Sequence, residues 1–149
     1  MIVSGLLVIF VADLKYHIIP DEILIAQIVA ALGYQVFFLR NLLLQNILTG
    51  LVFMGLFLLL VIITRGKGMG LGDVKMAFVM GFILGFPKVI VAFYLSFLTG
   101  ALVSLILVLG KSKYLKSTIA FGPFLCMAMF ATMFYGDYLW LIFKGIMGL

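Results

Sequence analysis

Two aspartates stand apart from the other acidic residues of this sequence. The chain of 149 residues has only five acids, and 66% of its residues are hydrophobic. Asp13 and Asp73 border or interrupt long apolar stretches, where a charged side chain is costly and tends to mark function. Two carboxylates that meet at one place cannot both ionise cheaply, so one keeps a proton while the other stays charged. Such a pair can activate a water molecule to attack a carbonyl group.

Short motifs of turn-forming and charged residues surround both aspartates: Pro20, Asp21, Gly70, Gly72 and Lys75. Because acids are favoured in the first turn of a helix, we expect Asp21 and Glu22 to lie in the first turn after Pro20 and Asp21 to have a supporting role, with capping of that helix as one form of it. Lys75 is expected either to tune the charge of the pair or to extend toward lipid headgroups. The glycines before Asp73 suit either a hinge or an ordinary flexible connection.

The composition sets the class of protein that must position these acids. Only 10% of the residues are charged, and several apolar stretches approach the roughly 20 residues that a transmembrane helix needs. The predicted fold is all-α, a polytopic transmembrane bundle of about six spans. They cover residues 1–18, 22–38, 43–64, 73–86 and 89–110, and a sixth begins near residue 118. Residues 1–149 form a single membrane domain in this interpretation.

The basic residues predict the orientation of the bundle. Most of the lysines and arginines fall after spans one, three and five, as at Lys15, Arg65 and residues 111–116. Cytoplasmic connections carry the excess of basic residues, so these ends are cytoplasmic and both termini lie outside. Asp13 and Asp73 then reach the same membrane depth at the cytoplasmic side. The net charge of +5 is explained by topology and by anionic lipid rather than by nucleic acid.

Three segments, taken in order, resemble the motifs of type IV prepilin and preflagellin peptidases. They are DLKYHIIPD at residues 13–21, GLGDVK at 70–75 and FGPF at 121–124. The resemblance implies that Asp13 and Asp73 are the catalytic residues of a Gly-x-Gly-Asp intramembrane aspartyl protease. It also makes Gly122 and Pro123 candidates for the substrate side, where they would either break span six and free backbone groups for a substrate strand or simply kink the helix.

The resemblance further implies an activity and a location. The enzyme would cleave the leader from prepilin-like or pilin-like precursors at the cytoplasmic face of a prokaryotic inner membrane, with lipids as its other partners and without a metal or other cofactor. The paired CxxC region of the larger, bifunctional members is missing from this sequence. We therefore expect a short form without N-methyltransferase activity.

Other classes of protein use similar residues. A proton- or ion-coupled transporter could also carry an intramembrane acid pair, although no internal repeat is evident here. Presenilin-like proteases share the Gly-x-Gly-Asp motif, but they pair it with Tyr-Asp and Pro-Ala-Leu, whereas Asp13 follows Ala12 and Pro123 precedes Phe124. A structural polar pair or an assembly subunit would tolerate neutral substitutions of both aspartates.

Overall fold

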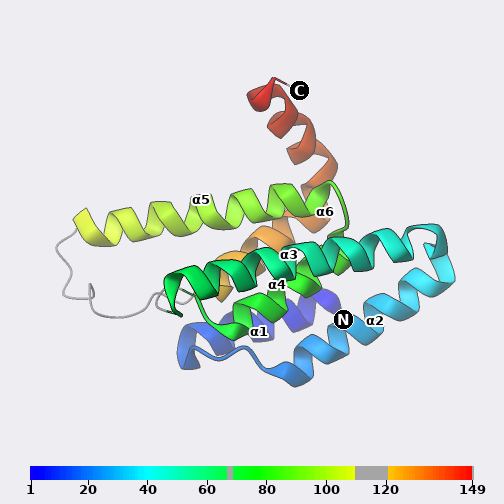
Figure 1. The fold of residues 1–149 in the computed structure, drawn as a ribbon, viewed down its shortest axis with the longest axis horizontal. Coiled ribbons are helices and arrows are strands. Elements are labelled where there is room, and N and C mark those ends of the chain that lie inside the picture. The colour runs from blue at the N-terminus through cyan, green and yellow to red at the C-terminus, as the bar shows by residue number, and fades with distance from the viewer. Residues whose placement is uncertain (67–68, 110–120, 149) are drawn as a thin grey trace.

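The computed structural model describes residues 1–66, 69–109 and 121–148, and these residues are helical apart from short connections (Figure 1). The helices are α1 (Ile2–Tyr16), α2 (Asp21–Phe38), the short 3-10 helix η1 (Arg40–Leu42), α3 (Leu43–Thr64), α4 (Leu71–Leu84), α5 (Lys88–Leu109) and α6 (Gly122–Met147). The all-α class and the order of the helices are therefore confirmed. The basic segment 111–116 and the predicted start of span six near residue 118 lie outside the described residues.

Among the described residues, four segments are long and apolar enough to cross a membrane: Asp21–Phe38, Arg40–Thr64, Lys88–Ile106 and Gly122–Gly145. Helices α1 and α4 have 15 and 14 residues. At about 1.5 Å per residue they are about 21–23 Å long, which is shorter than the hydrocarbon core of about 30 Å. More than half of the residues of α4 are buried, so this helix is enclosed mostly by protein.

Helix α4 lies at the centre of the bundle, with α1 and α2 below it in the view of Figure 1. It packs against α2, α3, α5 and α6, and its closest partner is α3. A Cβ atom at Gly81 of α4 would lie only 2.7 Å from the Cα atom of Gly50 in α3. The two glycines therefore let the helix backbones touch, as small residues commonly do between membrane helices.

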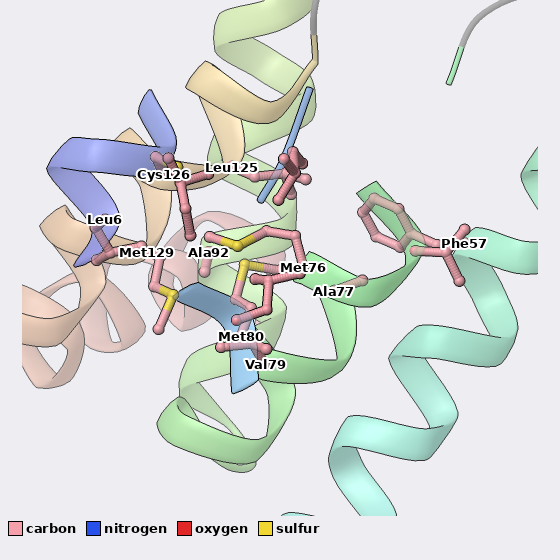
Figure 2. Packing of buried hydrophobic residues seen from close by; sticks show 14 of the residues in the cluster. Leu6, Phe57, Met76, Ala77, Val79, Met80, Ala92, Leu125, Cys126 and Met129 are labelled. Carbon is pink, nitrogen blue, oxygen red and sulfur yellow. The ribbon is translucent and has the colours of Figure 1, made fainter. Parts of the chain in front are cut away.

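The core of the bundle takes side chains from all six α-helices, mostly from α4 and α6, and includes Phe57 of α3 (Figure 2). Leu6, Met76, Met80, Leu125 and Met129 are all buried there. Many large apolar side chains also point outward from the helices. Exposed apolar surface of this extent would be unfavourable in water but suits contact with lipid tails.

A buried polar cluster ties the C-terminal end of α4 to its neighbours. The side-chain amide of Gln35 donates to the backbone carbonyl of Phe82 at 2.8 Å, and the amide of Asn46 donates to Gln35 Oε1 at 3.1 Å. These contacts join α2, α3 and α4 near the C-terminal end of α4, whereas Asp73 lies at its N-terminal end. Both amide side chains are buried, so each hydrogen bond compensates for the loss of water.

Candidate active site

Asp13 lies in the last turn of α1 and is buried, with 6% of its surface exposed. The helix ends at Tyr16 because His17 adopts a left-handed conformation (φ 52°), and its backbone N–H donates to the Asp13 carbonyl at 3.0 Å. The Oδ2 atom of Asp13 is buried and has no hydrogen-bond partner among the described residues. Such an atom is costly to maintain unless a ligand, a water molecule or a proton satisfies it.

Asp73 lies in the first turn of α4 and is as buried as Asp13, with 6% exposed. Its Oδ2 atom accepts a hydrogen bond from the backbone N–H of Gly70 at 2.9 Å. Gly70 is the N-cap residue, so this contact is the acidic half of a capping box. The helix start favours a negative charge at this position. The backbone of Gly70 is extended and the space around it is open, so nothing in the structure explains why this residue is a glycine.

The fold brings the two aspartates into one region although their helices do not pack together. Helices α2 and α6 each contact both α1 and α4, whereas α1 and α4 make no close backbone contact within the described ranges. Close contacts nevertheless link the two acids: the Cβ position of Gly122 lies against Asp13 Oδ2 and 3.3 Å from Ile19 Cδ1, and Ile19 lies 3.2–3.3 Å from the Cβ position of Gly72, the residue before Asp73. The two acids are therefore connected through Gly122, Ile19 and Gly72 and not through direct packing of their helices.

Gly122 forms the wall of this region on the α6 side. A Cβ atom at Gly122 would overlap Asp13 Oδ2 and would lie 2.9 Å from Asp13 Cγ. Gly122 and Pro123 occupy the first turn of α6, where proline is well tolerated. The Gly-Pro pair begins the described helix, and the predicted break or kink within span six stays a prediction, because the residues before Phe121 lie outside the described residues. The glycine lets the helix start come directly against the carboxylate.

Asp21 and Lys75 pair with each other. The Lys75 Nζ atom donates to both carboxylate oxygens of Asp21 at 2.7 Å, across 54 residues of sequence. Asp21 lies in the first turn of α2 as expected, but it does not cap the helix, since Pro20 is the N-cap residue and no side chain forms a cap hydrogen bond. The ammonium group of Lys75 is held by Asp21, and the two roles expected for Lys75 stay predictions. The pair ties the start of α2 to the start of α4.

Two residues near the aspartates have roles that the sequence did not suggest. Ile19 is buried between the two glycines that flank the acids, Gly72 and Gly122. Cys126 lies one turn after Gly122 and also lines an apolar groove of about 240 Å³ between α1 and α6. The sequence around Ile19 does not indicate that its side chain is buried, because an isoleucine between the end of a helix and a proline can equally well be exposed.

Within the described residues, no group of three or more His, Cys, Asp or Glu side chains is arranged to hold a metal ion. The side chains described above at the site are the carboxylates of Asp13 and Asp73, the thiol of Cys126 and the side chain of Ile19. The carboxylates supply the acid–base groups of this set, since Cys126 has no basic side chain among the contacts described here to activate it.

Comparison with known proteins identifies the family of this chain. The profile of the type IV leader peptidase family matches residues 1–105. The prepilin leader peptidase/N-methyltransferase of Bacillus subtilis strain 168 is 32% identical over 146 residues, which are 91% of this chain and 54% of that relative. The proteins of the same name from Aeromonas hydrophila and Legionella pneumophila are 33% and 38% identical over 76 and 69 residues.

Those two shorter matches cover 51% and 46% of this chain and 26% and 24% of the relatives. The chain thus spans about half the length of the Bacillus relative and matches about a quarter of the other two. No solved structure matches significantly. Since the family profile covers more than half of the chain and includes both Asp13 and Asp73, the chain belongs to the type IV leader peptidase family.

Proposed function

We propose that the protein is an intramembrane aspartyl endopeptidase that removes the leader from type IV prepilin-like or pilin-like precursors, with Asp13 and Asp73 as the catalytic pair. The observation that carries this proposal is the pair of buried aspartates on separate helices, linked by close contacts through Gly122, Ile19 and Gly72, in a chain of the leader peptidase family. Buried acids at membrane depth are expensive, and neither aspartate forms an ion pair in the described contacts that would explain it.

The chemistry follows from the pairing. One aspartate stays ionised and takes a proton from a water molecule, which then attacks the scissile carbonyl. The other aspartate is protonated, polarises the carbonyl oxygen and later gives its proton to the leaving amine. The two carboxylates titrate as a unit, so either aspartate can act as the base while the other acts as the acid. This reaction uses only the two side chains and water.

The arrangement of the helices supports a specific topology. In the proposal, all six α-helices form one membrane domain in a prokaryotic inner membrane, with both termini outside and the aspartates at the cytoplasmic side. Lys15 follows Asp13 at the end of α1, and Arg65 follows α3 shortly before Asp73. These basic residues mark the cytoplasmic end and favour anionic lipid headgroups as neighbours. Helix α4 can be short because protein, and not lipid, surrounds most of it.

Cleavage of a prepilin-type precursor in proteoliposomes tests the proposal. Asp13→Asn and Asp73→Asn should each reduce cleavage to background while the protein remains inserted and folded, because either change removes the shared-proton chemistry. Asp137→Asn is the matched control, since this aspartate is exposed and belongs to a separate ion pair with Lys88. If both site variants cleave at the wild-type rate, the aspartyl mechanism is excluded. If the wild-type protein itself does not cleave the precursor, a non-enzymatic or transport role for the acids gains support.

A further inference from the structure

The connection between α1 and α2 sends one side chain into the bundle. Ile19 is only 9% exposed, whereas the preceding Ile18 is 62% exposed. Three atoms of Ile19 lie 3.2–3.3 Å from the position that a Cβ atom would take at Gly72. Its Cδ1 atom lies 3.3 Å from the corresponding position at Gly122. A side chain from a surface connection therefore touches the backbone on both sides of the proposed catalytic pair.

Each of these two glycines lies directly next to one of the two aspartates. Gly72 directly precedes Asp73 in the chain, and Gly122 lies against the carboxylate of Asp13. Since α1 and α4 make no close backbone contact in the described ranges, their separation depends on what lies between them. Ile19 lies between Gly72 of α4 and Gly122 of α6, and Gly122 in turn contacts Asp13 of α1. Ile19 is β-branched, so it has few rotamers and a well-defined width.

The ion pair between Asp21 and Lys75 fastens this connection to α4. Asp21 follows Ile19 by two residues, and Lys75 follows Asp73 by two residues. Both oxygens of Asp21 accept from Lys75 at 2.7 Å. The pair therefore holds the connection next to the start of α4, beside the place where Ile19 enters. Its partners are 52% and 56% exposed, and pairs as exposed as this contribute little to stability.

We propose that Ile19 is a spacer that sets the separation of Asp13 and Asp73, and that the Asp21–Lys75 ion pair keeps this spacer in place. The three residues are positioning residues, because the contacts described for them are with the backbone around the aspartates and with each other. The inference rests on the proposed protease function. A displacement of about 1 Å at a reacting group can reduce a rate about a hundredfold, so a spacer of this kind would control turnover.

The first experiment measures cleavage of a prepilin-type precursor at several substrate concentrations, together with thermal unfolding of each variant. Ile19→Ala and Lys75→Met should lower kcat by at least about tenfold with little change in KM. Lys75→Arg should keep most of the rate, because a guanidinium group can pair with both oxygens of Asp21. Lys88→Met is the matched control, since it breaks the other ion pair, with Asp137 at 2.9 Å.

The unfolding midpoints of Lys75→Met and Lys88→Met should be similar, so a loss of rate only in the former is a positioning effect. Wild-type kcat in both Ile19→Ala and Lys75→Met would overturn the inference. If Lys75→Met and Lys75→Arg lower kcat equally, the role proposed for the Asp21–Lys75 ion pair is also overturned, because Lys75→Arg keeps the pairing.

The second experiment tests the contact between Ile19 and Gly72 by enlarging one side chain and shortening the other. Gly72→Ala adds a methyl group against Ile19 and should lower kcat. Ile19→Ala removes two of the three close atoms at that contact, so the double variant should be faster than Gly72→Ala alone. Such compensation is the non-additivity expected of residues in direct contact. Losses that simply multiply in the double variant would contradict the spacer.

Failure of the spacer and failure of the protease proposal give different results. If Asp13→Asn and Asp73→Asn abolish cleavage while every variant of Ile19 and Lys75 cleaves at the wild-type rate, only the spacer inference is wrong. If the two aspartate variants cleave at the wild-type rate, the proposed function is wrong, and the spacer inference is rejected with it.

Discussion

Replacing Gly122 by alanine perturbs the proposed site by a distance that the structure defines. The new Cβ atom would overlap Asp13 Oδ2 and would lie 2.9 Å from Asp13 Cγ. Carbon atoms prefer a separation of about 3.5–4.0 Å, so the carboxylate would have to withdraw by about 0.6–1.1 Å. Because a misplacement of about 1 Å can cost a factor of about a hundred, we expect kcat to fall about 10- to 100-fold. This corresponds to about 1.4–2.7 kcal/mol of activation free energy.

The assay is cleavage of a prepilin-type precursor in proteoliposomes at saturating substrate, which reports kcat. Gly145→Ala is the control, because it makes the same substitution in α6 at a position with no neighbouring atom within 4 Å. Both variants gain the better helix propensity of alanine, so a general loss of folding is not expected from either. A Gly122→Ala enzyme that turns over at the wild-type rate would refute the close approach of α6 to Asp13 as a requirement for catalysis.

Three further predictions concern stability and the thiol. Gly81→Ala places a methyl group against the backbone of α3 and should cost about 1–3 kcal/mol of stability, whereas Gly55→Ala, which enters open space, should not; thermal unfolding in lipid compares them. Asn46→Ala leaves the buried Gln35 oxygen without its donor and should lower the free energy of unfolding by about 1–3 kcal/mol. An unchanged free energy of unfolding would count against a stabilising role of the polar cluster. Cys126→Ser should keep cleavage within about tenfold, and complete loss in a folded variant would favour a thiol mechanism.

The helices follow closely from the sequence because hydropathy and helix-breaking residues act locally. The interval predicted for the third span, 43–64, has the same bounds as α3, and α2 starts one residue earlier than predicted, at Asp21. The short fourth span also follows from the sequence, because the predicted interval 73–86 has the length of α4, shifted to Leu71–Leu84. Only the three-dimensional packing reveals that protein surrounds most of this short helix.

The charged residues around the site show where local reasoning fails. An acid at a helix start is usually assigned to capping, and on that ground Asp21 was expected to accept N–H bonds from α2. The ammonium group of Lys75 competes for the same carboxylate with two charge-assisted contacts at 2.7 Å. Lys75 is 54 residues away in the chain, so no pattern within the first motif could indicate this partner.

The sequence by itself determined the class of the protein, the order of its helices and the two acids that need a functional explanation. Each of these depends on short-range properties: the apolar length of a segment, a glycine or proline that ends a helix, and the cost of a carboxylate in an apolar setting. The tertiary structure decided the contacts of Ile19 with Gly72 and Gly122, the Asp21–Lys75 ion pair and the approach of α6 to Asp13. These features are set by how whole helices pack, where atoms distant in the chain must share a few ångströms of space.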